Sequence, residues 1–303
     1  MKQRWLALSN EIKGVLMGMA SALLVTAYLV TNKHIYNTFH PSAVEYSLLF
    51  AVMGAVFALG SLMHRYDRQR YQRVWRDKWS FATLAAASFC AVGLLVIGQR
   101  YTSSINASFI GTSSIVTTML FSAVLLHESP SRRQLWWLAV LLVGLYLGVV
   151  GLHRLEITRG DAIVFVAAFF FGFGNVWSRR VMQRHGSFVV PNIRLVVAGI
   201  FALALSPLLV QHWQLLWSLL PWAVLAGLFY WLTMKTFATS VHLINANHAI
   251  VLNNGQIVTT SLAGVLLLGE HYTWEKLVGS VVVLVSIYAI TRKNGRRKSL
   301  KSS

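Results

Sequence analysis

The segment 245–260, NANHAIVLNNGQIVTT, places several polar side chains inside a long apolar stretch. Asn253, Gln256 and Thr260 are spaced i, i+3 and i+7, so a helix would present them on one face. Amide side chains donate and accept hydrogen bonds, and inside hydrocarbon such groups are costly unless they are paired. We therefore interpret Asn253, Asn254 and Gln256 as residues that line a path for a substrate.

A second polar stripe occurs 142 positions earlier, where Ile115–Thr118 repeats the IVTT of Ile257–Thr260. Small and polar residues again recur at helical spacing there. Together, the two stripes add four candidate substrate-binding residues, namely Asn106, Thr112, Ser114 and His248. For the Ser and Thr members, an equal alternative is that they only let two helices pack closely and form hydrogen bonds across the interface.

Aromatic and basic residues near other apolar stretches are further candidates. Tyr28, Trp177 and Tyr230 are predicted to form walls for an amphipathic ligand, although Trp177 fits equally well at the membrane interface. Lys235 and Arg194 would offer cations to an anionic substrate. Alternatively, Lys235 ends its transmembrane helix and anchors it at the membrane surface. Arg194 would instead extend its charged group to the membrane interface, and the same alternative applies to Glu45.

Other function classes find little support in these residues. The apolar stretches contain no metal-binding Cys and His spacing, no phosphate-binding glycine loop and no carboxylate pair, so we expect neither an enzyme nor a cofactor or metal. Loops are too short for a receptor or scaffold. Since no Asp or Glu falls in mid-membrane and His248 is the one internal titrating group, we expect facilitated diffusion or exchange rather than proton antiport.

The elements that must position these residues are transmembrane helices. Of 303 residues, 56% are hydrophobic and 12% are charged, whereas about 25% are charged in an ordinary soluble domain. A helix needs about 20 apolar residues to cross a membrane. Ten such stretches are predicted, at 14–31, 42–63, 81–98, 105–126, 135–152, 162–178, 189–210, 216–234, 246–268 and 272–291.

Lys and Arg residues predict the orientation of these crossings. With the N-terminus in the cytoplasm, 21 of them fall in cytoplasmic segments and 5 in outer loops. This asymmetry predicts that both termini are cytoplasmic, and it accounts for the net charge of +18. Because the charges are scattered over short loops, no nucleic-acid partner is expected.

The IVTT match belongs to a longer repeat with the same offset. Glu128 then matches Glu270, and Tyr146 matches Tyr288, in unbroken register over two crossings. Each half therefore contains five crossings. Because five is odd, the second half enters the membrane upside down, which predicts two inverted five-helix repeats around a central cavity. The Glu residues are predicted to interact with the helix that follows each turn.

The residues that carry this repeat resemble the EamA-type family of the drug/metabolite transporter superfamily. The resemblance rests on 100–147, RYTSSINASFIG and onward, and on 240–290, SVHLINANHAIV and onward. The family's helix ending in Leu-Leu-Gly-Glu appears as LLLGE in the second copy and departs to LLHES in the first. The resemblance covers nearly the whole chain and implies export or exchange of small metabolites.

The sequence thus predicts an all-α integral membrane protein of the cell inner membrane, with repeats at 1–152 and 153–292 and a basic cytoplasmic tail at 293–303. Its predicted function is efflux of small amphipathic metabolites, such as amino acids, by alternating access. Exchange of anionic metabolites through Lys235 and Arg194 is the alternative. The expected partners are a small-molecule substrate and the lipid bilayer, and a homodimer is left open.

Overall fold

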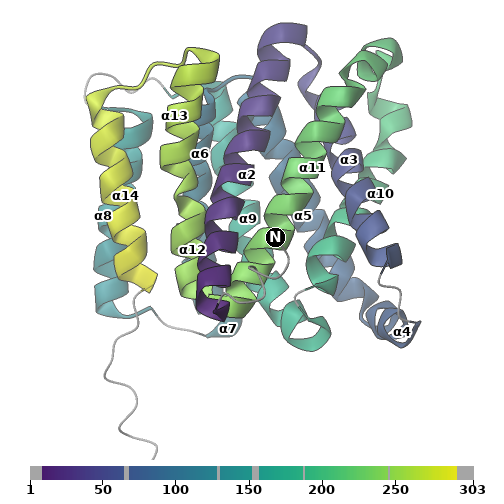
Figure 1. Cartoon of the computed structure of the whole chain (residues 1–303), viewed down its shortest axis with the longest axis horizontal. Coiled ribbons are helices and arrows are strands. Elements are labelled where there is room, and N and C mark those ends of the chain that lie inside the picture. Colours follow the sequence, from purple (N-terminus) through teal and green to yellow (C-terminus); the bar gives the residue numbers. More distant parts are fainter. Residues whose placement is uncertain are drawn as a thin grey trace, which may run out of the picture.

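The computed structural model describes residues 9–64, 68–127, 130–151, 157–186, 188–244 and 246–291, and regular structure within them is all helical. The first half holds α2 (Asn10–Phe39), α3 (Ala43–His64), α4 (Arg68–Arg76), α5 (Lys78–Gln99), α6 (Ser104–Thr112), α7 (Ser114–Leu126) and α8 (Arg132–Val149). The second half holds α9 (Arg159–His185), α10 (Val189–Leu209), α11 (Trp213–Ile244), α12 (Ala246–Asn254), α13 (Gln256–Leu268) and α14 (Trp274–Thr291). Figure 1 shows the long helices lying side by side.

Nine helical stretches within these ranges are long and apolar enough to cross a membrane, with α6–α7 counted as one and most of α12–α13 as another. The tenth unit is α8, which packs against α14. Its first turn carries Arg132, Arg133 and Gln134, so its apolar part is shorter than the helix. The predicted all-α class is confirmed, and the ten units agree with the ten predicted crossings.

Two of the predicted crossings are interrupted near their middle. Ser113 separates α6 from α7, and Gly255 separates α12 from α13, at the same offset of 142 as the sequence repeat. At both positions the backbone tightens: Ser113 N–H donates to the carbonyl of Ile110 at 2.9 Å, and Gly255 N–H to that of Leu252 at 3.1 Å. The sequence predicted one continuous helix at each place, so the two breaks are a correction.

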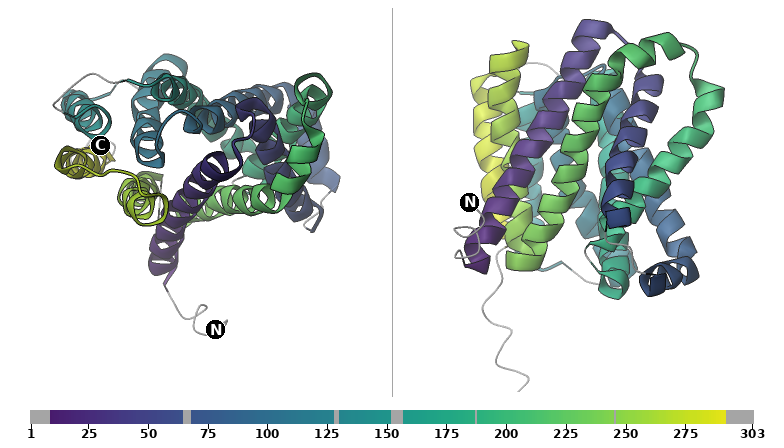
Figure 2. Two further views of the ribbon diagram at one scale, coloured as in Figure 1. Left: turned by 90° about the horizontal axis from the view of Figure 1, so that it is seen from above. Right: turned by 45° about the vertical axis from the view of Figure 1, so that its right-hand side comes forward.

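The main helix contacts join the two halves of the chain. The first helix of each half packs along the third crossing of the other, since α2 lies against α11 and α9 against α5. The second crossings, α3 and α10, pack together, and so do the last, α8 and α14. Figure 2 shows α2 and α11 in this contact. The halves are therefore interlocked rather than separate globules.

Glycines at equivalent positions make these contacts close. Gly14, near the start of α2, meets Ile244 at the end of α11, while Gly160, at the start of α9, meets the end of α5. A Cβ atom at Gly160 would lie 2.6 Å from the backbone nitrogen of Thr102, which is too close for any larger residue.

The bundle has two ends. The end where α2 begins is named the Asn10 end, and the opposite end is named the Phe39 end.

The helix α11 extends well beyond its predicted range. Lys235 was predicted to close this crossing, but the helix continues to Ile244. The segment 235–244 contains neither Pro nor Gly, and Ser240 donates a hydrogen bond of 2.8 Å to the carbonyl of Gly14 on α2. Contact with α2 thus supports the extra turns. The Nζ atom of Lys235 lies 5.0 Å from the centre of the Trp231 ring.

Candidate substrate-binding site

The polar stripe on α12 and α13 faces α2, and part of it is used for helix packing. Ser21 donates a hydrogen bond of 2.7 Å to the side-chain oxygen of Asn253. The hydroxyls of Thr26 and Thr260 share a hydrogen bond of 2.9 Å. Because these bonds tie the broken helix to the first helix of the other half, Asn253 and Thr260 hold the two halves in register.

The remaining two amides of this stripe have different surroundings. Asn254 is buried, and its amide donates to the carbonyl of Ile250 in the same helix at 2.8 Å. The Oε1 atom of Gln256 is also buried, yet it has no hydrogen-bond partner among the described residues. A buried polar atom without a partner is unusual and calls for a ligand or water. Gln256 is therefore the stripe residue with unused bonding capacity.

The first-half stripe faces α9 in the equivalent way. Thr117 donates to the carbonyl of Ala168 at 3.0 Å, and Thr118 accepts a long hydrogen bond of 3.5 Å from Asn175. In the second copy, Thr259 contacts Thr26 on α2 at 2.6 Å. The threonines of both IVTT segments thus contact the first helix of the opposite half, which is the packing role left open from sequence.

Two glycines of these helices leave space around them: Gly111, two residues before the α6–α7 break, and Gly174 on α9. A Cβ atom at Gly111 or Gly174 would meet no atom within 4 Å, although Gly174 is buried. Asn175 is the neighbouring exposed amide on α9. Asn175 was not among the predicted residues, although an Asn within the apolar run FFFGFGNVW is a signal of the same kind as Asn253.

Two predicted residues lie at this break, and their hydrogen bonds stay within their own helices. Thr112 is buried and donates to the carbonyl of Ser108 in its own helix at 3.0 Å. Ser114 is half-buried, and its carbonyl accepts a hydrogen bond of 2.6 Å from Thr118. Both residues therefore shape the backbone beside the break.

The aromatic residues Tyr28 and Tyr230 come together in the core. Their ring centres are 5.5 Å apart, and Phe50 on α3 lies 5.4 Å from Tyr230 and 6.2 Å from Tyr28. The hydroxyl of Tyr230 is buried and has no partner in the described segments. The sequence indicated the two tyrosines but not Phe50, because nothing in the pattern distinguishes it from the other phenylalanines.

The two charged residues predicted to snorkel are both buried, so that interpretation is wrong for each. Glu45 is 2% exposed and accepts hydrogen bonds from the backbone N–H groups of Gln211 and His212 at 2.8 and 3.3 Å. It thereby binds the backbone at the start of α11, where a helix favours negative charge. Arg194 is 6% exposed, and its Nε atom has no acceptor within the described ranges.

The remaining candidates lie away from the core. Asn106 is in the first turn of α6 at the Phe39 end, where it accepts a hydrogen bond of 2.9 Å from Lys276. Trp177 lies toward the Asn10 end of α9 and donates to the carbonyl of Ser80 at 3.0 Å. His248 is exposed near the start of α12. The structure therefore does not bring these three together with the tyrosines.

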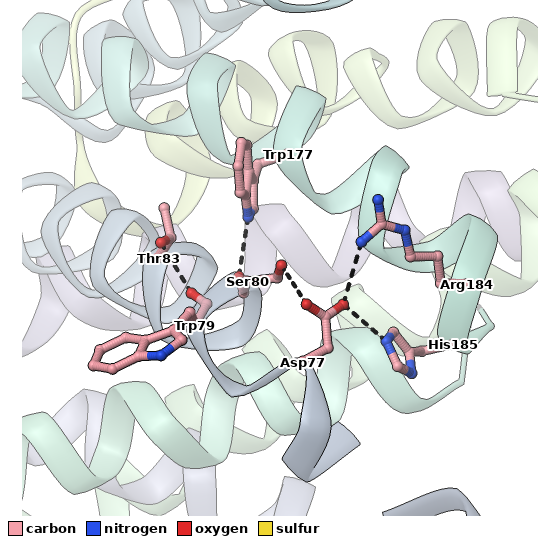
Figure 3. A network of polar contacts seen from close by, with 7 residues as sticks. All are labelled: Asp77, Trp79, Ser80, Thr83, Trp177, Arg184 and His185. Carbon is pink, nitrogen blue, oxygen red and sulfur yellow. Dashed lines mark hydrogen bonds and ion pairs between the residues drawn. The ribbon is translucent and has the colours of Figure 1, made fainter. Parts of the chain in front are cut away.

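A polar network surrounds Asp77 at the Asn10 end (Figure 3). Asp77 precedes α5, and its carboxylate accepts a hydrogen bond of 2.6 Å from Ser80. From α9, the His185 ring lies 3.1 Å from this carboxylate, and Arg184 lies at 3.6 Å. Partial burial raises the pKa of Asp77, but these hydrogen bonds and charges outweigh it and hold the pKa below its usual value. The network fastens α5 to α9.

A second network closes the Phe39 end. Lys33 donates to the carbonyls of Gln99 and Thr102 at 3.1 and 2.6 Å. Asp161 accepts hydrogen bonds from Thr102 and, at 3.5 Å, from Asn106. These contacts join α2, α5, α6 and α9, and with Lys276 they include α14 as well. Each end of the bundle thus has its own set of cross-half polar bonds.

Glu270 was predicted to bind the start of the helix that follows it, but it forms its hydrogen bonds with a different helix. Its two carboxylate oxygens accept hydrogen bonds from the backbone N–H groups of Ser104 and Ile105, at 2.7 and 3.0 Å. These groups begin α6, in the other half of the chain. The favourable pairing of a carboxylate with a helix N-terminus was expected, but the partner helix is different. The equivalent Glu128 lies outside the described residues.

An open cavity of about 530 Å³ lies at the Phe39 end. Its lining includes His40, Arg100, Tyr101 and His212. None of the predicted substrate-binding residues is part of its described lining, so this cavity is separate from the predicted site.

Comparisons with known proteins agree with this architecture. The sequence model of the EamA-like transporter family matches residues 12–150 and again 158–292. A curated relative, the "Uncharacterized inner membrane transporter YicL" of Salmonella typhimurium, is 22% identical over 224 residues, which are 71% of this chain and 75% of the relative. One protein crystal structure is similar with a TM-score of 0.60 and 14% identity, over 92% of this chain and 97% of that one. The last likeness concerns the fold alone.

Proposed function

The chain belongs to the EamA-like transporter family, and on that premise we propose that it exports small amphipathic metabolites across the cytoplasmic membrane by alternating access. The relative named as an inner membrane transporter supports the location. The positive-inside asymmetry supports cytoplasmic termini. In the proposed cycle, the Asn10 end is the cytoplasmic side.

The observation that carries this proposal is the pseudo-symmetric interlocking of the halves. Equivalent helix pairs, α2 with α11 and α9 with α5, occur on the two sides of the core. Transporters with repeats of this kind open alternately to the two sides by moving one set of helices against the other. The polar networks around Asp77 and Lys33 then act as closures at opposite ends.

The lining proposed for the substrate consists of an aromatic wall and a few polar groups. Tyr28, Phe50 and Tyr230 provide the wall, and Gln256 and Asn175 provide amides. Apolar walls with a small number of placed polar groups are typical of small-molecule sites. An amphipathic metabolite fits such a lining better than a strongly charged polyol or a large peptide does.

A test begins with cells that contain or lack the protein. Their intracellular and extracellular metabolites are compared without preselection, and compounds that move outward with the protein are loaded into reconstituted vesicles. We expect release above that of protein-free vesicles, and exchange when unlabelled compound is present outside. A Gln256→Leu protein that remains folded serves as the matched control. The proposal fails if no loaded compound leaves faster than from protein-free vesicles.

Exchange of anionic metabolites through Lys235 and Arg194 is a second candidate function. The burial of Arg194 without a carboxylate partner in the described segments favours it, whereas Lys235 already contacts the Trp231 ring. If Lys235→Ala and Arg194→Ala both leave flux unchanged, neither cation takes part in transport and this candidate function is excluded.

For either function we expect facilitated movement, so a pH gradient without a substrate gradient should produce no uphill accumulation. Accumulation that disappears in His248→Ala would contradict this.

A further inference from the structure

Arg194 is a fixed positive charge in the interior of the bundle. It lies in the second turn of α10, is 6% exposed, and forms no hydrogen bond or ion pair with another described residue. A buried charge without a partner is strongly unfavourable, more so in a membrane protein, where such residues mark substrate pathways. Its presence therefore calls for an anion that the described residues do not supply at this place.

Four carboxylates of the described residues are bound to other groups. Two of them bind the backbone at helix starts, and two take part in the end networks; they are Glu45, Glu270, Asp77 and Asp161. Of the other two described acids, Glu11 is exposed at the Asn10 end, and Glu275 lies in the first turn of α14 at the Phe39 end. The charge of Arg194 is thus left uncompensated by any described acid.

Tyr230 provides a second unused hydrogen-bond donor in the same region. Its hydroxyl is buried without a partner in the described segments. The two helices are pinned at the neighbouring positions, because Trp231 donates a hydrogen bond of 3.0 Å to the side chain of Asn192. Tyr28 and Phe50 complete an aromatic surface around the Tyr230 ring.

The guanidinium of Arg194 and the hydroxyl of Tyr230 are both hydrogen-bond donors, so a ligand between them must supply acceptors. A carboxylate can accept two parallel hydrogen bonds from the planar guanidinium group of arginine. One buried cation balances one negative charge, so a monoanion is favoured over a phosphate dianion. We infer that Arg194 and Tyr230 receive the carboxylate of the transported substrate, while Tyr28 and Phe50 contact its apolar part. The inference rests on the proposed transport function, and it limits the substrates to apolar monocarboxylates.

Binding to the purified protein tests the site without any transport. Thermal unfolding is measured with 3-phenylpropionate, with its uncharged amide and with phenyl phosphate. We expect the carboxylate to stabilise the wild-type protein and to bind at least tenfold more tightly than either other compound. Arg194→Gln should remove this preference, and Tyr230→Phe should weaken carboxylate binding several-fold. Arg73→Gln, which removes an exposed arginine of α4, is the matched control and should bind normally.

The unliganded variants provide an independent readout. Since Arg194 has no partner among the described residues, Arg194→Leu should raise the melting temperature of the empty protein. A lower melting temperature, reproduced by Asp67→Asn, would instead mean that the arginine is paired within the chain, and it would overturn the inference. Equal binding of amide and carboxylate, or carboxylate binding that survives Arg194→Gln, would overturn it too.

Vesicle flux separates this inference from the proposed function. If the carboxylate binds with the expected dependence on Arg194 but is never released faster than from protein-free vesicles, the binding site is supported and transport fails. If uncharged amphipathic compounds are transported equally by wild type and Arg194→Gln, transport is supported and the carboxylate site is overturned.

Discussion

Gln256 and Asn253 lie three residues apart on the interrupted crossing, but their side chains have different surroundings. Asn253 accepts a hydrogen bond from Ser21, whereas the oxygen of Gln256 has no partner among the described residues. We expect Gln256→Leu to remove most transport and leave the melting temperature nearly unchanged. Asn253→Leu should lower the free energy of unfolding by about 0.6–1.7 kcal/mol, the cost of one interhelical hydrogen bond. Normal flux in a folded Gln256→Leu protein would reassign Gln256 to packing.

Asp77 makes the Asn10 end sensitive to acid. Its pKa is lower in the folded protein than the usual value of about 3.9, so its ionised form stabilises the fold above that pH. This stabilisation is lost as the pH falls through the lowered pKa. We expect Asp77→Asn to cost about 1 kcal/mol near neutral pH, with the difference from wild type shrinking below pH about 4.

Thermal unfolding in detergent across this pH range measures the effect of Asp77→Asn. Glu11→Gln, which removes an exposed acid near the start of α2, is the matched control. A cost for Asp77→Asn that is the same at pH 7 and at the acid end of the range would exclude the ionic contribution.

At the scale of elements, Glu270 links the turn after α13 to the start of α6. Glu270→Gln keeps a hydrogen-bonding side chain but removes the charge that favours a helix N-terminus, an effect of about 0.3–2 kcal/mol. We expect faster hydrogen exchange at the amides of Ser104 and Ile105, which donate to Glu270. The amides at the start of α14 should change less, because the hydrogen bonds of Glu270 go to α6. The opposite pattern is expected for Glu275→Gln, an acid in the first turn of α14.

At the scale of the whole molecule, the two ends of the bundle should lie on opposite sides of the membrane. Tyr101 at the Phe39 end is 50% exposed, and Trp75 on α4 at the Asn10 end is 74% exposed. In a Cys90→Ala background, Tyr101→Cys should react with a membrane-impermeant thiol reagent on intact cells. Trp75→Cys should react only after permeabilisation. Reaction of both from the same side would refute the proposed membrane placement.

Sequence alone determined the membrane class, the ten crossings and the repeat. Each of these follows from a local property: apolar runs long enough to span hydrocarbon, or residue types that recur at a fixed offset.

Tertiary structure decided the partners of the polar side chains that link the two halves, such as Glu270 and Asn253, because these partners lie far away in the sequence. Glu270 forms hydrogen bonds with the start of α6 rather than with the nearby α14. Asn253 accepts a hydrogen bond from Ser21, whereas the side-chain oxygen of Gln256 has no partner among the described residues. Spacing along one helix fixes which residues share a face, but not which helix covers that face. The burial of Arg194, read from sequence as snorkelling, depends in the same way on the helices that surround α10.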